Sequence, residues 1–468
     1  MIEMRLAEVA TVTGGRLHRA SGDERVSAVE FDSRAIGPGG LFIALPGERV
    51  DGHAFAAAAV AAGAAGVLAG REVDAPAVIA PPVGRQEGTY LAESDHDGAG
   101  AAVLAALAAL AGHAVRALPA TVVGVTGSSG KTSTKDLLAA VLAPLGPTVA
   151  PPGSFNNELG LPWTVLRADE ATRHLVLEFS ARGTGHIARL AAVAPPRIGV
   201  VLNVGRAHVG EFGSVEAIAQ AKGELVEALP ADGVAVLNAD DPLVAAMANR
   251  TRARVVTFGR SAADVRAEDV RLEGARAHFT LVTPAGRAPV ALRLVGEHHV
   301  ANALAAAAVA LELGGTPEGV AAALGAAEPA SKWRMEVTDR PDGLTVVNDA
   351  YNSNPESMRA ALSALAAIGG GRRRTWAVLG PMAEQGDGAR AVHAEIAAAA
   401  RELRIDRLVG VGTADYPGAE LTADVGEAID LLRGEARPGD VVLVKASRSA
   451  GLERVAEGLL HEPGPVPR

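Results

Sequence analysis

The chain has 468 residues and a formal net charge of −10; 49% of its residues are hydrophobic and only 3% are aromatic. This length predicts two or three domains, each large enough for its own core. The negative charge and the few aromatic side chains argue against a surface that coats nucleic acid, and the absence of cysteine excludes disulfides, Cys-ligated zinc and thiol nucleophiles.

A chain without cysteine fits a reducing compartment, so we expect a cytoplasmic protein. The most apolar run, residues 99–111, is too short to span a bilayer, and the N-terminus has no apolar signal core. We therefore expect no membrane insertion and no nucleic-acid partner.

The first 98 residues combine short strands, at 29–32 and 41–45, with an alanine-rich helix from about Phe55. They end in a polar, glycine-containing stretch at 93–100, where we place a domain boundary. We predict a small α/β N-terminal domain over residues 1–98.

From residue 99 helices alternate with unbroken apolar strands, at 122–125, 175–179, 198–203 and 234–238. Strands without polar alternation are typical of a parallel sheet that is covered on both faces. Two strands that flank Pro284-Ala285-Gly286 predict an antiparallel hairpin that extends the sheet. We predict a central domain over residues 99–329.

Strands alternate with helices again after residue 330, at 376–379, 408–411 and 441–444. This pattern predicts a separate Rossmann-like domain over residues 330–468. The predicted fold class is thus α/β with three domains.

A glycine-rich turn lies between an apolar strand and a helix start, with the sequence Thr126-Gly127-Ser128-Ser129-Gly130-Lys131-Thr132. Backbone N–H groups in such a turn bind phosphate together with the positive end of the helix; Lys131 would reach the β- and γ-phosphates and Thr132 would hold Mg²⁺. Val125 stands where the general motif has its first glycine. We predict a nucleoside triphosphate site; a chance glycine turn with a solvated lysine is the alternative.

Glu178 ends an apolar strand at the edge where open α/β sheets bind their ligands, which makes it a candidate metal ligand. His208 follows the next strand by a short loop and would emerge at the same edge. Taken singly, an ordinary surface carboxylate and an ordinary loop histidine are the alternatives.

Lys222 shares a helix face with Ile218, Leu225 and Leu229, and that face should be buried. A side chain that snorkels to the surface is one explanation. The other is that burial lowers its pKa, so that the neutral amine reacts with CO₂ and the resulting carbamate binds Mg²⁺.

Together these motifs resemble the Mur ligases of peptidoglycan synthesis, and the resemblance covers all three domains. Besides the phosphate loop it rests on these segments: Phe31-Asp32-Ser33-Arg34, Asp51-Gly52-His53, 155–162, 177–180, 203–208, 220–224, Asn302, 333–336, Asp349-Ala350-Tyr351-Asn352-Ser353-Asn354-Pro355, 379–384 and 445–448. Ser180, Gln385 and Ala446 depart from the usual pattern of the members that add D-alanyl-D-alanine, and these departures concern the peptide and acceptor pockets.

The resemblance implies an ATP-dependent ligase that joins D-alanyl-D-alanine to UDP-N-acetylmuramoyl-tripeptide through an acyl phosphate. It implies catalytic roles for Lys131, Glu178, His208 and Lys222. One Mg²⁺ would be held by Thr132 and Glu178, and a second by Glu178, His208 and a carbamylated Lys222. Domain closure over the nucleotide would complete the site, and we expect a monomer.

The resemblance also implies which residues contact the substrates. ATP would be bound by the phosphate loop with Asn302, Arg334 and Asp349. Ser33 and Arg34 would bind the uridine nucleotide. The remaining substrate contacts would come from Asn156, Asn157, Ser180, Tyr351 and Asn352.

Three other functions share part of this sequence pattern. A sister ligase would add a diamino acid or a glutamate, but the Asp-Asn-Pro-Arg type of acceptor motif is absent. A P-loop GTPase or kinase is disfavoured because no Asn-Lys-x-Asp motif occurs. A non-catalytic nucleotide-binding scaffold would not need the ligands of a second metal. The sequence leaves open whether the third residue of the donor peptide is lysine or meso-diaminopimelate.

Overall fold

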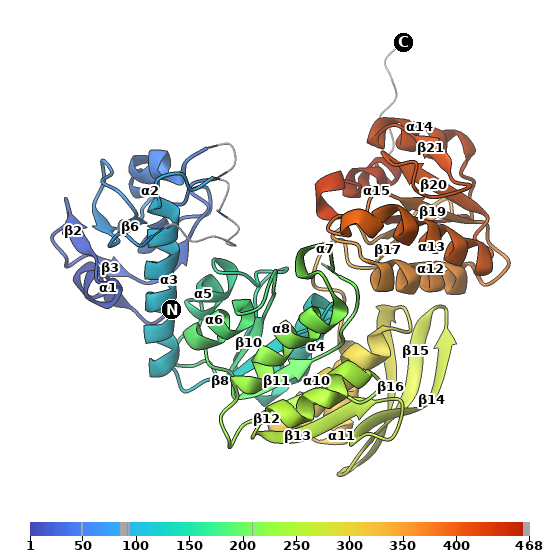
Figure 1. Ribbon diagram of the computed structural model, residues 1–468, viewed down its shortest axis with the longest axis horizontal. Coiled ribbons are helices and arrows are strands. Elements are labelled where there is room, and N and C mark those ends of the chain that lie inside the picture. The colour runs from blue at the N-terminus through green and yellow to red at the C-terminus, as the bar shows by residue number, and fades with distance from the viewer. Residues whose placement is uncertain (48–49, 85–90, 92–93, 208, 462–468) are drawn as a thin grey trace.

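The computed structural model describes residues 1–47, 50–84, 91, 94–207 and 209–461. Three large β-sheets in this part of the chain follow one another from the N-terminus to the C-terminus, each with helices packed against it (Figure 1). The α/β fold class with three domains is therefore confirmed.

The N-terminal sheet has five strands in the order β2-β7-β6-β5-β4, and only β2 runs antiparallel to its neighbour. Its strands are β2 (Arg16–His18), β4 (Ala28–Glu30), β5 (Gly40–Ile43), β6 (Gly66–Ala69) and β7 (Ala77–Ile79). Strands β1 (Met4–Arg5) and β3 (Arg25–Val26) pair separately, and the helices are α1 (Leu6–Thr13) and α2 (Ala56–Ala61), which follows the 3₁₀ turn Gly52–Phe55.

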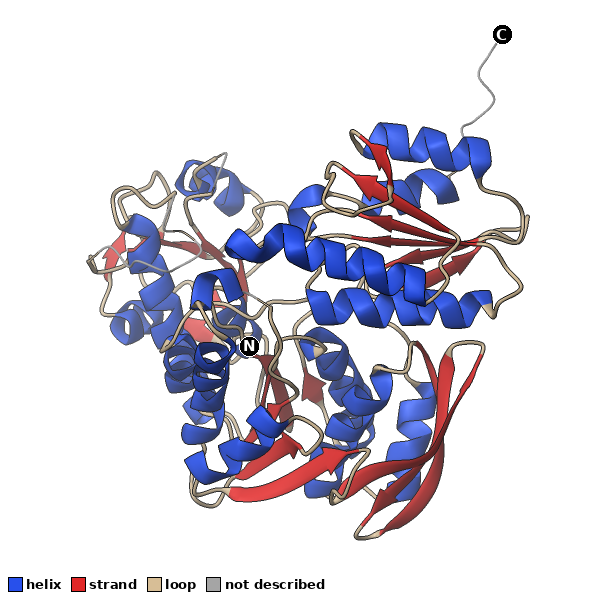
Figure 2. Ribbon diagram, turned by 45° about the vertical axis from the view of Figure 1, so that its right-hand side comes forward, coloured by secondary structure: helices blue, strands red, loops and turns tan. Residues whose placement is uncertain are grey.

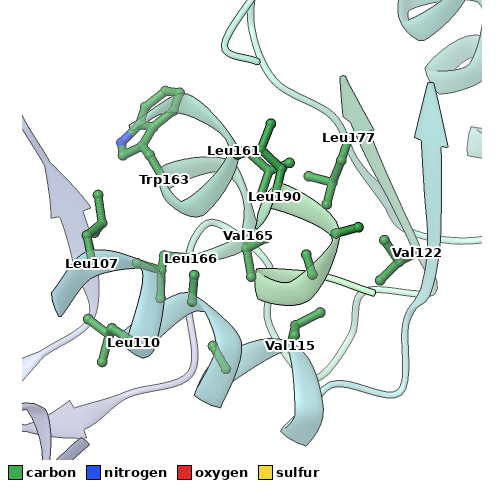
Figure 3. Packing of buried hydrophobic residues seen from close by; sticks show 14 of the residues in the cluster. Leu107, Leu110, Val115, Val122, Leu161, Trp163, Val165, Leu166, Leu177 and Leu190 are labelled. Carbon is green, nitrogen blue, oxygen red and sulfur yellow. The ribbon is translucent and has the colours of Figure 1, made fainter. Parts of the chain in front are cut away.

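Helix α3 (Ala99–Ala117) lies between the N-terminal and central sheets (Figure 1). The expectation that its apolar run is too short to span a membrane is wrong, because the helix continues past Ala111 to 19 residues, with a mean hydropathy of 1.5 over an 18-residue window. Its most apolar window is 67% buried inside the protein. Figure 3 shows Leu107 and Leu110 of α3 beside Leu166, as expected of a core helix.

The central sheet has nine strands in the order β16-β15-β14-β13-β12-β11-β8-β10-β9. The pairs from β9 to β14 are parallel, while β14, β15 and β16 pair antiparallel, which confirms both the parallel sheet and the hairpin. The strands are β8 (Thr121–Thr126), β9 (Thr148–Val149), β10 (His174–Glu178), β11 (Ile198–Val201), β12 (Val234–Asn238), β13 (Arg254–Gly259), β14 (Val265–Glu273), β15 (Arg276–Thr283) and β16 (Gly286–Val295).

Helices cover both faces of this sheet. On one face α10 packs against α4 with the fully buried residues 303–310, six of which are alanines whose small side chains allow a close approach. On the other face α8 packs on β11 and α3 packs on α5 and α6. The helices are α4 (Lys131–Leu142), α5 (Gly160–Val165), α6 (His186–Val193), α7 (Val209–Phe212), α8 (Val215–Glu227), α9 (Pro242–Ala245), α10 (His299–Glu312) and α11 (Pro317–Ala326).

The C-terminal sheet has six strands in the order β17-β18-β22-β19-β20-β21, parallel except for β17. Helices lie on both of its faces (Figure 2), as the Rossmann-like prediction requires. Its elements are β17 (Glu336–Asp339), β18 (Thr345–Asn348), α12 (Pro355–Gly369), β19 (Thr375–Leu379), α13 (Ala389–Glu402), β20 (Arg407–Val411), β21 (Glu420–Thr422), α14 (Val425–Glu435), β22 (Val441–Lys445) and α15 (Glu453–Leu460).

Three aromatic rings join the N-terminal part to the central part. Trp163 of α5 contacts Phe31 and Phe155 with ring centroids 5.4 and 4.8 Å away. The Trp163 indole Nε1 also donates a hydrogen bond to the carbonyl oxygen of Val29, over 3.0 Å. In a chain with so few aromatic residues, this cluster fixes where the N-terminal part sits.

Candidate active site

The phosphate loop connects the end of β8 to the first residue of α4, as predicted. Gly130 has φ +80°, and a Cβ there would lie only 2.5 Å from Asn302 Oδ1, so the position requires glycine. Lys131 Nζ donates to the carbonyl oxygen of Gly127 over 2.8 Å. Asn203, just after β11, accepts a hydrogen bond from Ser129 N over 2.9 Å and so holds the loop to the next strand.

Glu178 lies at the carboxyl end of β10 and is only 1% exposed. Three side chains donate hydrogen bonds to its carboxylate: Thr132 Oγ1 over 3.1 Å, Ser154 Oγ over 3.0 Å and Asn156 Nδ2 over 2.7 Å. The prediction that Thr132 and Glu178 share one sheet edge is confirmed. Ser154 was not predicted, because it lies in an irregular segment with no motif around it.

Two lysines lie in the same part of the structure as this carboxylate; Lys131 is half-buried and Lys222 is buried. Burial lowers the pKa of Lys131, while Glu178 acts in the opposite direction. Burial also lowers the pKa of Lys222 far below its ordinary value, and the charge of Lys131 lowers it further. Lys222 lies on the buried face of α8 at 5% exposure, so it does not snorkel to the surface. Within the described residues its amine has no hydrogen-bond or ion-pair partner, and the neutral form is therefore favoured.

Arg334 extends from the start of the C-terminal part to the phosphate loop. Its Nη2 donates to Thr132 Oγ1 over 3.1 Å, and its guanidinium carbon lies 4.1 Å from the ring centroid of Tyr351. Trp333 and Met335, on either side of it, have φ values of +58° and +50°, which non-glycine residues rarely adopt. The strained backbone on both sides of Arg334 directs its side chain towards the phosphate loop.

Asp349 forms a buried ion pair with Lys445, with 2.5 Å between Oδ2 and Nζ. Its other oxygen, Oδ1, accepts a hydrogen bond from Met335 N over 3.1 Å. Burial lowers the pKa of Lys445, and the charge of Asp349 opposes that shift. Asp349 therefore supports the segment that carries Arg334. Lys445, which was not predicted as a site residue, neutralises the negative charge of Asp349.

A cavity of about 270 Å³ opens where the central and C-terminal parts meet. Most predicted site residues line it: Ser128, Ser129, Gly130, Lys131, Thr132, Asn156, Asn157, Glu178, Ser180, Lys222, Arg334, Tyr351 and Asn352. Ser154, Arg182, Ser353, Asn354 and Glu384 also line it and were not predicted. One chamber thus joins the phosphate loop to residues more than 200 positions later in the chain.

Some predicted residues lie elsewhere. Asn302 and Asp349 do not line the cavity; Asn302 packs against Gly130 from α10. Ser33 and Arg34 belong to the N-terminal part, where the exposed Arg34 side chain bonds to Asp32. These hydrogen bonds lower the pKa of Asp32 to about 2. His208 lies outside the described residues.

Oxygen ligands for a divalent cation gather at one point of the cavity, because Thr132, Ser154 and Glu178 contact one another there. Mg²⁺ prefers such ligands, and a single carboxylate is a common protein contribution. In the described ranges no group of three or more His, Asp or Glu side chains is placed to hold a metal. The donors present therefore fit a cation that takes its remaining ligands from phosphate and water.

Sequence profiles of three domains match the chain in order. They are the Mur ligase family, catalytic domain, at residues 25–114; the Mur ligase middle domain, at 125–310; and the Mur ligase, glutamate ligase domain, at 333–448. Several relatives are named UDP-N-acetylmuramoyl-tripeptide--D-alanyl-D-alanine ligase. The one from Mycobacterium tuberculosis (strain ATCC 25618 / H37Rv) is 56% identical over 99% of this chain and 98% of its own length, and the one from Escherichia coli (strain K12) is 35% identical over 98% and 99%.

Solved structures agree with these relatives. MurF from Acinetobacter baumannii superposes with a TM-score of 0.84 at 30% identity, covering 98% of this chain and 99% of that one. MurF ligase from Thermotoga maritima, solved in complex with ADP, gives a TM-score of 0.76 at 28% identity, covering 92% and 97%. With full-length relatives well above 30% identity and all three domain profiles in order, this chain belongs to the Mur ligase family.

Proposed function

We propose that this protein joins D-alanyl-D-alanine to UDP-N-acetylmuramoyl-tripeptide with the consumption of ATP, giving the pentapeptide precursor of peptidoglycan. The observation that carries the proposal is the full-length match to ligases of this name, at 56% identity over 99% of the chain. The cavity supports it, because it brings a phosphate loop, a buried carboxylate and the C-terminal segment 351–354 together.

An amide cannot form from a free carboxylate and an amine without activation, so the peptide carboxylate first takes the γ-phosphoryl group of ATP. The phosphate-loop N–H groups and Lys131 hold the β- and γ-phosphates. Arg334 lies against Thr132, where it offsets the charge that develops on the transferred group. The amine of D-alanyl-D-alanine then attacks the acyl phosphate and phosphate leaves.

We also propose that the site binds two Mg²⁺ ions. Thr132 and Glu178 would hold the first, with Ser154 as an added hydroxyl, and Glu178, His208 and a carbamylated Lys222 would hold the second. Bound there, Mg²⁺ supplies charge neutralisation for the phosphoryl group and the reacting carboxylate. The unpartnered, buried Lys222 supports carbamylation, since its neutral amine adds to the carbon of CO₂ and releases one proton.

The remaining assignments are proposals of the same kind. Asn302 and Asp349 would contact the adenosine of ATP, and Ser33 and Arg34 the uridine nucleotide. Asn156, Asn157, Ser180 and Asn352 would contact the peptide substrates. Tyr351 would contact the peptide substrates too. It would also hold the guanidinium of Arg334, which stacks on its ring.

We also propose domains at residues 1–98, 99–329 and 330–468, in a cytoplasmic monomer that acts on small molecules. Each of these ranges contains one of the three large sheets.

Phosphate release tests the function directly. The purified protein is incubated with ATP, Mg²⁺ and UDP-N-acetylmuramoyl-tripeptide, with and without D-alanyl-D-alanine. We expect release only with the dipeptide, and a nucleotide sugar heavier by the dipeptide minus water. Release that needs a single amino acid instead would assign the chain to a sister ligase; no release with a lysine- or a diaminopimelate-containing donor would favour a non-catalytic role.

A further inference from the structure

Arg206, in the turn that follows β11, is held by two glutamates of the C-terminal part. The Arg206 backbone N–H donates to Glu356 Oε1 over 3.0 Å, and Arg206 Nη2 donates to Glu395 Oε2 over 2.8 Å. Glu356 lies in the first turn of α12 and Glu395 lies on α13. Arg359 of α12 also donates to Glu395, over 3.1 Å, and so fixes that carboxylate from within its own domain.

Gly210 of α7 makes a second contact with the C-terminal part. Its N–H donates to the carbonyl oxygen of Glu384 over 3.2 Å. A Cβ at this position would lie 2.7 Å from Gly386 N and 2.9 Å from Glu384 O. Both of these are backbone atoms, so any side chain at position 210 would push the two parts away from each other.

The same turn is bonded to the phosphate loop. The N–H of Gly205 donates to Ser128 Oγ over 2.9 Å, and Ser128 Oγ lies 3.4 Å from Gly205 O. From the other side, Asn354 Nδ2 lies 3.4 Å from Ser128 O, and Asn354 is the N-cap of α12, next to Glu356. Ser128 therefore contacts both the turn and the C-terminal part.

We propose that Arg206 and Gly210 are positioning residues that couple closure of the C-terminal part to the conformation of the phosphate loop. Closure brings Glu356 and Glu395 onto Arg206 and brings the Glu384–Gly386 backbone onto Gly210. The turn then holds Ser128 in place while Arg334 reaches Thr132. The inference rests on the proposed function, since it concerns the step that assembles the ATP site.

Two variants test this, each with a matched control. Gly210→Ala adds a methyl group at the interface, while Gly388→Ala adds one where no heavy atom lies within 4 Å. Arg206→Glu reverses a charge between the two parts, while Arg197→Glu reverses one whose partner, Asp232, lies in the same central part at 2.9 Å. Arg206→Lys serves as the conservative rescue.

Four quantities are measured: kcat, KM for ATP, the midpoint of thermal unfolding, and closure. Because the chain has no cysteine, fluorophores attached at Ala262→Cys and Asp430→Cys, both exposed, report closure by energy transfer without background labelling. We expect Gly210→Ala and Arg206→Glu to lower kcat at least tenfold and to reduce the ATP-dependent change in energy transfer. We expect Arg206→Lys to recover part of both, and the two controls to behave like the wild type.

The unfolding midpoint separates positioning from a merely structural role. The added methyl group of Gly210→Ala acts at the contact between the two parts and removes nothing from either core, so this variant should unfold close to the wild-type temperature. The proposal would be overturned if both variants kept the wild-type kcat and the wild-type energy transfer. It would also be overturned if kcat fell only in proportion to a lower unfolding midpoint. A wild type that does not close on ATP would overturn it too. If the wild type closes on ATP but makes no product, the proposed function fails, and the energy-transfer comparison still decides the inference.

Discussion

Arg334 and Thr132, which are 202 positions apart in the chain, share a hydrogen bond of 3.1 Å across the boundary between the central and C-terminal parts. Thr132 simultaneously donates to Glu178, so the guanidinium, the hydroxyl and the carboxylate form one continuous chain of contacts. This relationship ties the position of the C-terminal part to the chemistry of the phosphate loop.

Replacing Arg334 by lysine should lower kcat by about 10² to 10³, the loss typical when one preorganised donor to the transition state is removed. Lysine keeps the charge but has neither the planar fork nor the stacking on Tyr351. Steady-state phosphate release measures the effect. Arg340→Lys, which alters an arginine bonded to Leu459 O within the C-terminal part, is the control and should retain activity. Equal losses in the two variants would contradict the assignment.

Glu178→Gln should reduce turnover by more than about a hundredfold and shift the Mg²⁺ dependence to higher concentrations. The amide removes the negative charge. Its NH₂ group is a donor, and it would face the Thr132, Ser154 and Asn156 groups, which donate to the carboxylate in the wild type. A Mg²⁺ titration of phosphate release is the measurement. Glu158→Gln, outside the cavity, should leave the titration unchanged. An unaltered Mg²⁺ dependence in Glu178→Gln would remove this residue from the metal site.

His298 should make the protein less stable as the pH falls. Burial lowers its pKa to about 4, and Nδ1 is buried with no hydrogen-bond partner in the described part of the chain. Between pH 6.5 and 4 the unfolded state therefore binds more protons than the folded state, and the free energy of unfolding falls with decreasing pH. This one group accounts for a loss of about 2 kcal/mol between pH 7 and pH 5.

NMR titration of the histidine ring protons measures that pKa, and unfolding of the wild type and His298→Gln at pH 7 and pH 5 measures the stability difference. The variant should lose about 2 kcal/mol less than the wild type over this interval. The exposed His113→Gln variant is the control and should follow the wild type. A ring that titrates near pH 6.5 would contradict the expectation.

Trp163→Ala should loosen the N-terminal part. Removing a buried tryptophan typically costs about 3 to 5 kcal/mol, and Trp163→Phe, which loses chiefly the hydrogen bond to Val29, about 0.5 to 1.5 kcal/mol. Because the proposed uridine-binding residues lie on this part, KM for the UDP-linked donor should rise while KM for ATP stays constant. A rise in both would show that the ring cluster supports the whole central part instead.

Much of the site could be predicted because its residues sit in strongly patterned surroundings. The phosphate loop lies between an apolar strand and a helix, Glu178 ends an apolar strand, and the helical period placed Lys222 on a buried face. Each of these predictions uses only short-range sequence order and the rule that parallel strands present their carboxyl ends at one edge.

Other features could not be predicted in this way. Ser154 lies in an irregular segment, and Lys445 reaches the site through contacts with Asp349 and with the carbonyl oxygen of Asn352, more than 90 positions away in the chain. The most apolar run in the sequence stops at Ala111, whereas helix α3 continues to Ala117 and is longer than that run predicts. Such features depend on tertiary packing and on helix termination, which local composition does not determine.

The cavity has a consequence for how this enzyme could be divided. Its walls come from the central and C-terminal parts, which are joined covalently only by the segment between α11 and β17. If the chain were cut in this segment and the two fragments were produced separately, each would carry part of the cavity lining. Neither fragment alone would contain the complete proposed nucleotide site. Activity would then depend on the concentration of both fragments and appear only on mixing, so that catalysis itself would report their association.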